Sequence, residues 1–479
     1  MTSIWWIRGD VRLRDQPALQ AAQRGGEVVP LFILDPSLLC QTPRRRQAFL
    51  FAALRALDSE LLTRGARLVI RSGQPVEVLQ RLMHEVKAQA VFAEMDYTPF
   101  ARRRDELVAR TLDLHLLEGR AVQSPTSVSK SDGSPYSVYT PYSRAWKKHL
   151  PERLPLHLAP ERLEMPAAIH SEQLPELPRD DAFPASEAEA HRRLRDFTAE
   201  RIYAYEGKRD RMALDGTSAL SPYLRFGMLS MRAVVDAALR ALSAAGSEPA
   251  RHSAETWLNE LIWREFYIQI MYHHPRVHAT AFRTNFSGIL WRNNSSEFEA
   301  WKAGLTGVPI VDAGMRQLSK TGWMHNRARM LAASYLVKDL LIDWRWGERW
   351  FMDQLIDGDP SSNNGGWQWI AGTGTDAAPY FRVFNPVLQS RKFDPDGHYI
   401  RRWVPELAGV RSEAIHAPWE RGIVIAGYPR VPIVNHAAAV RRARLAYENA
   451  KDLAGFKGSE GQPVTHPSKI SMPGAHAAN

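Results

Sequence analysis

Residues 321–369 read TGWMHNRARMLAASYLVKDLLIDWRWGERWFMDQLIDGDPSSNNGGWQW. Six tryptophans and a row of Asn, Arg and Asp residues recur there at helical spacing, without a metal-binding or nucleophile motif. A chain that performs its chemistry unaided typically shows a Cys/His pair, a serine elbow or a metal cluster. The stretch therefore predicts a bound aromatic cofactor and electron chemistry, for which the protein supplies position and electrostatics.

Composition limits the class of protein. The chain has 479 residues, which is enough for about two or three domains. Its net charge of +10 fits a polyanionic partner, and it equally fits an ordinary, mildly basic protein. The single cysteine, Cys40, excludes an internal disulfide and suits a reducing compartment. We find no signal peptide and no apolar run of membrane-spanning length, so we expect a cytoplasmic protein.

Apolar runs alternate with amphipathic stretches from the N-terminus to about residue 120. This alternation predicts a doubly wound parallel sheet. The expected strands cover residues 3–7, 28–34, 67–70, 90–95 and 114–119, and the expected helices cover 17–24, 44–64, 75–87 and 100–112. No G-x-G-x-x-G sequence follows the first strand, where the chain reads RGDVRLRDQPAL. A conventional dinucleotide site is therefore not expected in this domain.

The organisation changes after this domain. Prolines are spaced through residues 151–190 and predict a long surface connector: Pro151, Pro155, Pro160, Pro166, Pro175, Pro178 and Pro184. Beyond it, helical periodicity covers 187–205, 231–243, 254–273, 309–321, 326–342 and 347–356. We expect an α/β domain over 1–125, a connector over 126–190, an all-α domain over 191–455 and a disordered tail over 456–479.

One predicted helix has a polar and aromatic face. The sequence WLNELIWREFY, residues 257–267, places four such side chains on that face: Trp257, Glu260, Arg264 and Tyr267. Trp263 lies beside Glu260 at a spacing of three residues. An ordinary core face would consist of Leu and Ile, so the pattern indicates a lined cavity. A structural ion pair flanked by packing aromatics explains it as well.

A second predicted helix, over residues 326–339, places Asn326, Arg329, Met330 and Ala333 on one face. Arg329 is a natural partner for an acid of the LIDGD turn, either Asp357 or Asp359. Such a pair can orient a polar edge of a cofactor, and it can equally hold two helices together.

The sequence DGDPSSNNGGWQW, residues 357–369, indicates a loop in which Gly365 and Gly366 permit a tight turn or close approach to a ligand. The side chains of Asn363 and Asn364 can donate and accept hydrogen bonds, which suits a heterocycle. A plain turn is the alternative explanation.

Hydroxyl side chains cluster in DGTSALSPYLRFG, residues 215–227. We expect Ser221 to cap a helix that Pro222 opens. With Thr217 and Ser218, the same residues could also form an anion site for a pyrophosphate.

These segments, taken in order, resemble the photolyase/cryptochrome family, and most closely class I-type bacterial deoxyribodipyrimidine photolyases. The resemblance covers about residues 1–440. It rests on an ordered set of motifs: WWIRGDVRLRDQPAL, EGKRD, TSALSPYLRFG, WLNELIWREFY, TGWMHNRARM, LIDGD, NNGGWQW and DAAPYFRVFNP.

The resemblance implies an α/β antenna domain followed by an all-α domain that holds reduced FAD in a U shape. The residues implied to bind FAD are Tyr205, Thr217, Ser218, Ala219, Leu220, Ser221, Trp257, Arg264, Arg329, Asp357, Gly358, Asp359 and Asn363. Asn363 corresponds to the position that faces the central-ring nitrogen of the flavin. A neutral amide there favours the reduced anionic flavin, because a carboxylate would repel its charge.

The implied reaction is light-driven repair of cyclobutane pyrimidine dimers in UV-damaged DNA by electron transfer from FAD. The implied catalytic residues are Glu260, Asn326, Met330 and Asn363, and the implied DNA and lesion contacts are Arg209, Glu260, Trp263, Tyr267, Asn326, Arg327, Met330, Trp369 and Gln389. Trp367, Trp344 and Trp291 correspond to the tryptophan chain that photoreduces FAD, whereas Trp323, Trp346 and Trp350 are expected to serve packing.

The resemblance also implies a second, light-harvesting chromophore in the antenna domain and narrows its chemical identity. Folate-binding relatives have an Asn-Glu pair where this chain reads TPFARRRD, residues 98–105. Pro99, Arg102, Arg104 and Asp105, together with Arg225, are closer to deazaflavin- or flavin-type members. We expect a monomer without a metal ion.

Three alternatives stay open. A (6-4) photolyase of the animal type would have histidines in place of Asn326 and Met330. A cryptochrome, which signals instead of repairing DNA, would lack lesion contacts or carry a long C-terminal extension. The third alternative is a flavoprotein that binds DNA without repairing it.

Overall fold

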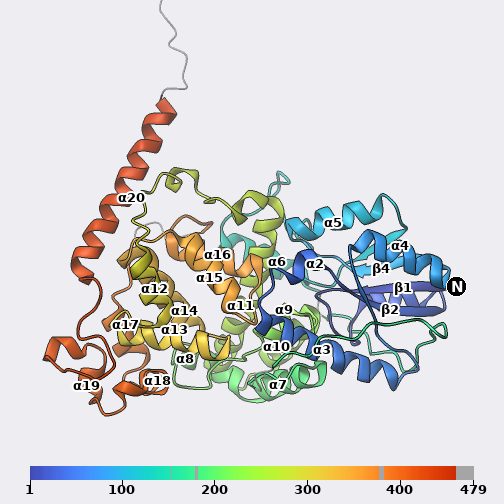
Figure 1. Ribbon diagram of the computed structural model, residues 1–479, viewed down its shortest axis with the longest axis horizontal. Coiled ribbons are helices and arrows are strands. Elements are labelled where there is room, and N and C mark those ends of the chain that lie inside the picture. Colours follow the sequence, from blue (N-terminus) through green and yellow to red (C-terminus); the bar gives the residue numbers. More distant parts are fainter. Residues whose placement is uncertain (152, 179–181, 377–381, 460–479) are drawn as a thin grey trace, which may run out of the picture.

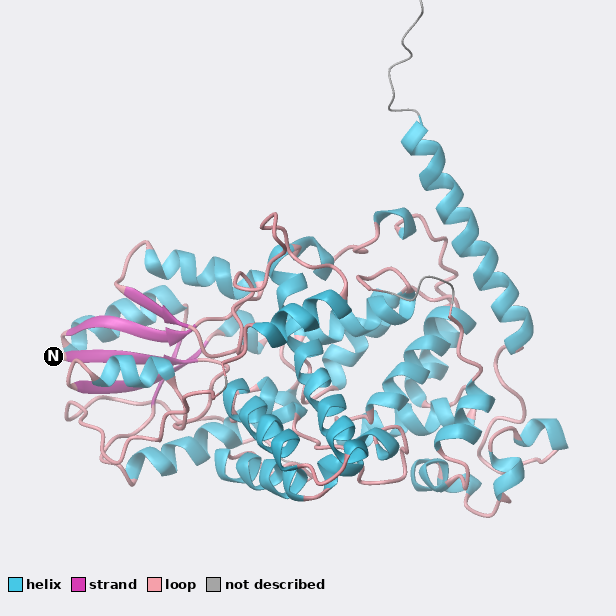
Figure 2. Cartoon of the chain, turned by 180° about the vertical axis from the view of Figure 1, so that it is seen from behind, coloured by secondary structure: helices cyan, strands magenta, loops and turns pink. Residues whose placement is uncertain are grey.

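The computed structural model describes residues 1–151, 153–178, 182–376 and 382–459. An α/β half and a helical half lie side by side, with the N-terminus at the end of the sheet that points away from the helical half (Figures 1 and 2). The expected fold class, a parallel α/β domain followed by an all-α domain, is confirmed.

The sheet is five-stranded and parallel, in the order β3-β2-β1-β4-β5. Its strands are β1 (Thr2–Ile7), β2 (Glu27–Leu34), β3 (Val69–Ser72), β4 (Ala88–Glu94) and β5 (Leu114–Leu117). β1 is buried along its whole length, as expected for a strand covered by helices on both faces. The covering helices include α1 (Pro17–Gln23), α3 (Arg44–Leu62), α4 (Pro75–Val86) and α5 (Pro99–Ala109), and a short α2 (Pro36–Leu39) follows β2. The strand order reverses between β1 and β4, so a crevice is expected at their carboxyl ends.

The described residues after β5 form helices and loops, apart from one isolated bridge. The helices that build the site are α8 (Tyr205–Lys208), α9 (Ser221–Arg225), α11 (Glu248–His273), α14 (Asn326–Ser334), α15 (Trp344–Gln354) and α16 (Pro360–Ala371). Around them lie α7 (Glu187–Ala199), α10 (Met231–Ala244), α12 (Ser295–Ala303), α13 (Pro309–Thr321), α17 (Pro386–Phe393), α18 (His398–Trp403) and α19 (Ser412–Ile415). No helix in the described part of the chain is long and apolar enough to cross a membrane.

The predicted loop over residues 357–369 is wrong. Asp359 accepts a hydrogen bond from the Ser362 N–H (3.0 Å), and helix α16 runs from Pro360 to Ala371 despite two glycines in its middle. Gly365 is required by packing, because a Cβ at this position would lie 2.1 Å from the ring of Tyr267. The helix projects Asn363 and Trp367 from one face.

Two further expectations at element ends differ from the structure. Ser221 is the first residue of α9 and makes no capping bond; its hydroxyl instead accepts from Trp323 Nε1 (3.2 Å). The predicted helix over residues 326–342 is α14 followed by a π-helical turn, η4 (Tyr335–Asp339).

The connector and the tail contain helices that the sequence did not predict. Helix α6 (Tyr139–Lys148) lies within residues 126–190 and packs against α11. Helix α20 (His436–Ser459) extends to residue 459, into the stretch expected to be disordered, and projects from the body of the molecule (Figure 1). The rest of the tail, residues 460–479, lies outside the described residues.

Candidate active site

A cavity of about 590 Å³ opens in the helical half, within the range of small-molecule sites. All the residues that the resemblance assigns to FAD line it: Tyr205, Thr217, Ser218, Ala219, Leu220, Ser221, Trp257, Arg264, Arg329, Asp357, Gly358, Asp359 and Asn363. Eight of the nine proposed lesion and DNA contacts line it as well: Arg209, Glu260, Trp263, Tyr267, Asn326, Arg327, Met330 and Trp369. Gln389 lies on α17 and is not among the lining residues.

The deep side of the cavity, which we call the inner wall, contains Trp257, Asp357, Asp359, Asn363 and Trp367. The side chain of Asp357 is 1% exposed and pairs with Arg329 across 2.7 Å, as the sequence predicted. Its second oxygen, Oδ1, is buried and has no partner among the described residues. Asp357 lines the cavity, and an unpartnered carboxylate oxygen on a lining residue is a position for a hydrogen-bond donor of a ligand.

Asn363 occupies the inner wall through α16. Its Nδ2 donates to the backbone carbonyl of Glu348 on α15 (3.0 Å), which leaves the amide oxygen as an acceptor. One turn later, Gly366 has open space where a Cβ would stand, so a ligand can approach the backbone of α16 closely. At the opposite side, Ala219 adopts a left-handed conformation (φ 49°), a strained state for a residue with a Cβ.

Asp359 interacts with arginines from both halves of the molecule. Burial alone would raise its pKa, but Arg264, Arg225 and Arg120 outweigh that effect and hold the pKa below its ordinary value. Arg120 comes from the segment after β5 and approaches Asp359 to 3.8 Å. The α/β half therefore contributes a positive charge to the residue that caps α16.

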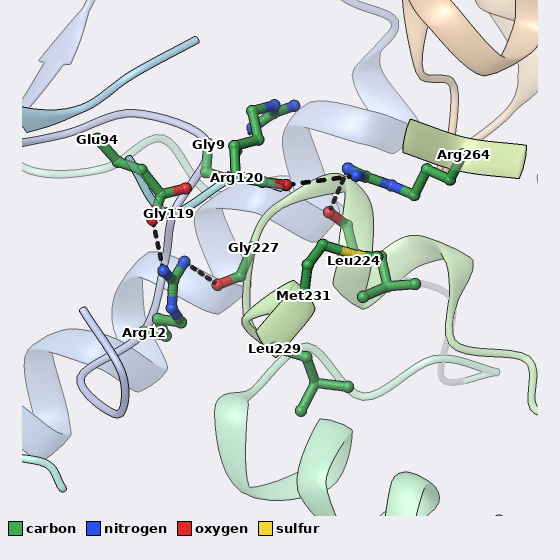
Figure 3. Close-up of a pocket in the computed structure, with 10 residues that line it drawn as sticks. All are labelled: Gly9, Arg12, Glu94, Gly119, Arg120, Leu224, Gly227, Leu229, Met231 and Arg264. Carbon is green, nitrogen blue, oxygen red and sulfur yellow. Dashed lines mark hydrogen bonds and ion pairs between the residues drawn. The ribbon is translucent and has the colours of Figure 1, made fainter. Parts of the chain in front are cut away.

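A second, small cavity of about 10 Å³ lies at this junction (Figure 3). It has room for about one water molecule. Arg12 donates to Glu94 and to the Gly227 carbonyl (3.1 Å for Gly227), while Arg264 donates to the Leu224 carbonyl across 3.4 Å. Gly227 has a positive φ of 58°, and a Cβ there would lie 2.5 Å from the Gly9 carbonyl oxygen. Only glycine permits so close an approach of the two halves.

The open side of the cavity, which we call the mouth, contains two acid–base pairs. Arg209 pairs with Glu260 across 2.5 Å, and their side chains are 32% and 37% exposed. Arg327 binds Asp210 through Nε (3.1 Å) and Nη2 (2.6 Å). Burial raises the pKa of Glu260 above its ordinary value, although the nearby guanidinium of Arg209 partly offsets the effect.

Aromatic and amide side chains complete the mouth. Trp263 on α11 and Trp369 on α16 are half-buried, and Asn326 on α14 is exposed. Asn326 Nδ2 lies 3.9 Å from the sulfur of Met330, one turn along the same helix. The buried His325 caps this helix by accepting the Arg327 N–H (3.1 Å), and burial lowers the pKa of the ring to about 4. The cap therefore stays neutral in ordinary buffers.

The three tryptophans of the proposed electron-transfer chain differ in their surroundings. Trp367 lines the cavity and is buried; Trp344, at the start of α15, is buried in the same hydrophobic cluster. Trp291 is half-buried and packs against that cluster. Its other neighbour is Tyr447 of α20, with ring centroids 6.1 Å apart.

The residues of the proposed antenna site lie at the carboxyl edge of the sheet. Asp105 of α5 pairs with Arg8, which follows β1, across 2.5 Å. Arg8 Nε and Asp105 Oδ2 are buried without partners among the described residues. Arg225 lines the large cavity and donates to the Gly358 carbonyl (2.7 Å), and its charge also interacts with Asp96, which follows β4.

Comparisons with known proteins decide the family. The family model for DNA photolyase matches residues 3–161, and the model for the FAD binding domain of DNA photolyase matches residues 257–449. The deoxyribodipyrimidine photo-lyase of Salmonella typhimurium is 41% identical over 473 residues, which cover 94% of this chain and 99% of the relative. This chain belongs to the photolyase/cryptochrome family.

Solved structures of the family have the same fold. A bacterial class III photolyase from Agrobacterium tumefaciens superimposes with a TM-score of 0.88 at 38% identity, covering 94% of this chain and 98% of that one. An archaeal photolyase from Sulfolobus tokodaii, solved with two FAD molecules, gives 0.79 at 33% identity, covering 94% and 100%.

The large cavity of this photolyase-family chain fits FAD. The unpartnered Asp357 Oδ1, the open space at Gly366 and the amide of Asn363 offer polar and close-contact positions along one wall. In the described residues, no group of three His, Cys, Asp or Glu side chains could hold a metal ion.

Sequence reasoning gave no cavity role to several lining residues: Asp210, Leu224, Arg225, Leu261, Trp323, Met324, Ala333, Phe351, Leu355, Ser362 and Ile370. Gly366, which was expected to permit close approach to a ligand, does line the cavity. Ile370 shares the helical face of Asn363 and would have followed from a helix over 360–371. Trp323, expected to serve packing, also lines the cavity. Ala333 was placed on the correct face of its helix without a role, and Asp210 lies beside Arg209 in the EGKRD motif.

Proposed function

We propose that this chain is a deoxyribodipyrimidine photo-lyase that repairs cyclobutane pyrimidine dimers in DNA under near-UV or blue light. One observation carries the proposal: a single cavity has a buried, charge-paired inner wall suited to a permanent cofactor and a half-open aromatic mouth suited to a flat, apolar substrate. When bound, reduced FAD supplies the light-excited electron that opens the two bonds of the cyclobutane ring, and it accepts the electron back afterwards.

The protein binds and orients both partners. Arg329, Asp357 and Asp359 hold the flavin, and the neutral amide of Asn363 avoids repulsion of its reduced, anionic form. At the mouth, Glu260 hydrogen-bonds the carbonyl edge of the dimer and stabilises the charge that develops there. Trp263 and Trp369 form the apolar walls, while Asn326 and Met330 contact the dimer from α14.

DNA is held mainly through its phosphates. Arg209 and Arg327 lie at the mouth, where a duplex with a flipped-out dimer would pass, and Gln389 of α17 is proposed as a polar neighbour. Contacts of this kind position the duplex without reading its sequence. Unstacking is easiest at a damaged step, which contributes to selectivity. We propose that the protein acts as a monomer in the cytoplasm.

We propose that Trp367, Trp344 and Trp291 photoreduce oxidised FAD by successive short hops. The support is their sequence of environments, from the cavity wall through a buried cluster to a half-buried position.

We propose a deazaflavin or flavin as the antenna chromophore, in preference to a folate. Arg8 and Asp105 have buried polar atoms without partners at the carboxyl edge of β1 and β4, where doubly wound sheets bind ligands. The related Sulfolobus tokodaii photolyase holds a second FAD. Absorption and mass spectra of the cofactors released from purified protein will identify the chromophore, and a folate would contradict this assignment.

Repair assays test the main proposal. Reduced protein is incubated with oligonucleotides that contain either a cyclobutane dimer or a (6-4) photoproduct, in the light and in the dark. We expect loss of cyclobutane dimers only in the light. Repair of only the (6-4) lesion would identify a (6-4) photolyase, and binding without repair would indicate a cryptochrome or another DNA-binding flavoprotein.

A further inference from the structure

Trp263 has a stacking partner outside the cavity. Its indole ring lies parallel to the ring of Tyr139, with centroids 3.7 Å apart and planes 3° apart. Trp263 lines the large cavity, whereas Tyr139 does not. Tyr139 is the first residue of α6, which lies in the connector. The connector therefore covers one face of a residue whose other surface borders the cavity.

Tyr139 is fixed in place at two further points. Its hydroxyl donates to the Asn259 carbonyl (2.8 Å), one turn before Trp263 on the same helix. Its backbone N–H donates to Asp376 Oδ2 (3.3 Å), in the segment that follows α16. Next to it, Thr375 donates to the Ser137 carbonyl. The start of α6 is thereby joined both to α11, which carries Trp263, and to the chain that continues from Trp369.

The C-terminal end of α6 is also attached to α11. Trp146 Nε1 donates to Glu265 Oε2 (2.7 Å), and Lys147 pairs with Glu255 across 2.7 Å. Both acids lie on α11, on either side of Trp263 in sequence. Because α6 is attached along its length, Tyr139 cannot move away from the indole without breaking contacts at both ends of the helix.

We propose that Tyr139 is a positioning residue, which holds the indole of Trp263 in the orientation that receives the flipped pyrimidine dimer. The inference rests on the proposed function and adds to it a residue of the connector. A half-exposed tryptophan with one face uncovered would sample several side-chain rotamers, and ordering it on binding would reduce affinity. The parallel stack removes that freedom before the substrate arrives.

A double-mutant cycle between Tyr139 and Trp263 tests the inference. We expect Tyr139→Leu to weaken binding of a dimer-containing duplex about 3- to 10-fold, the usual effect of losing an aromatic pair. Affinity for undamaged duplex and FAD content should not change. Tyr139→Phe keeps the stack and should restore affinity to within about twofold, because only the hydroxyl contact is lost. In a Trp263→Leu background, Tyr139→Leu should have no further effect.

The matched control is Phe92→Leu, which removes a stacked pair of the sheet, Phe92 with His115 at 4.8 Å, far from the cavity. This variant should bind dimer-containing DNA as the wild type does. An equal loss of affinity from Tyr139→Leu with and without Trp263 would overturn the inference, since Tyr139 would then act on the fold in general. An unchanged affinity for damaged DNA in Tyr139→Leu would overturn it as well.

A second readout separates this inference from the proposed function. If the wild-type protein does not bind dimers, the proposed function fails, and the orientation of Trp263 is then followed by near-UV circular dichroism. Tyr139→Leu should change the spectrum relative to Tyr139→Phe, and the change should disappear in the Trp263→Leu background. A change that persists without Trp263 would contradict the positioning role.

Discussion

The inner wall and the mouth of the cavity treat charge differently. At the inner wall, Asp357 is almost fully buried and paired with Arg329, and Asp359 is compensated by three arginines. At the mouth, Arg209 and Glu260 pair with each other while their side chains stay 32% and 37% exposed. Buried pairs are fixed, whereas half-exposed pairs exchange partners easily. The first arrangement suits a ligand that stays, and the second suits one that comes and goes.

Removing a charge from the inner wall should have the largest effect. Arg329→Met leaves the Asp357 carboxylate buried without a partner. An uncompensated buried charge of this kind raises the free energy of the site by about 3 kcal/mol. We take the low end of the range for buried pairs, because Arg329 itself borders the cavity. We expect FAD affinity to fall by about 100-fold, measured from the flavin absorbance that remains after gel filtration.

The matched control is Arg327→Met at the mouth, which removes an arginine from the pair with Asp210. It should keep FAD and weaken binding of all DNA, damaged or not. Loss of FAD from both variants to the same extent would mean that the inner wall and the mouth do not differ in this way.

The second prediction concerns Trp344, which lies in the same buried cluster as the inner-wall residue Trp367. Trp344→Phe keeps an aromatic ring in the buried cluster but removes an easily oxidised indole. Photoreduction of oxidised FAD should be slowed by up to about 100-fold, as a change of up to about 3 kcal/mol in one barrier would give. Repair by chemically reduced enzyme should stay nearly normal. Photoreduction at the wild-type rate would remove Trp344 from the proposed chain.

The third prediction concerns the mouth alone. Glu260→Ala removes a hydrogen-bonding carboxyl from the dimer and leaves Arg209 unpaired, so repair should fall about 10- to 100-fold. The FAD content of the purified protein should not change, because Glu260 does not contact the inner-wall pairs. The repair rate is measured at limiting light, and the FAD content of the same sample is measured from its flavin absorbance. A parallel loss of flavin would place Glu260 in the cofactor site instead.

The cavity could be predicted from the sequence where its residues share one helix. The faces of α11 and α14 follow from a spacing of three and four residues, and the Arg329–Asp357 pair follows from complementary charge. Helix α16 could not be predicted in this way. Gly365 and Gly366 disfavour a helix locally, and the tight contact of Gly365 with Tyr267 outweighs that preference.

Long-range contacts left no signal in the sequence. Tyr139 lies in a proline-rich connector, 124 residues before Trp263, and nothing near it indicates the stack. Arg120 follows the last strand of the sheet and approaches Asp359 only because the two halves pack through glycines such as Gly227. These residues are placed by tertiary packing, which periodicity and local motifs do not encode.

The smallest expected effect is a pH dependence confined to the mouth. Burial raises the pKa of Glu260 in the free protein, and Arg209 holds that rise in check. When a phosphate draws Arg209 away, the pKa of Glu260 should rise further, so binding of damaged DNA should take up a proton. Affinity should therefore fall as pH increases between the free and the bound pKa of Glu260, by at most about tenfold per pH unit.

The groups that face Glu260 allow this dependence to be assigned. Arg209 and Arg327 are the cations that face Glu260, and burial raises the pKa of Tyr205 further from neutrality. Asp210 is the other carboxyl at the mouth, so Asp210→Asn serves as the control and should preserve the slope. Glu260→Gln cannot titrate and should bind damaged DNA with an affinity that no longer varies with pH. A slope that survives in Glu260→Gln would assign the proton uptake to another group. A wild-type protein whose affinity does not vary with pH would mean that Arg209 and Glu260 stay paired in the complex, and that the mouth is as fixed as the inner wall.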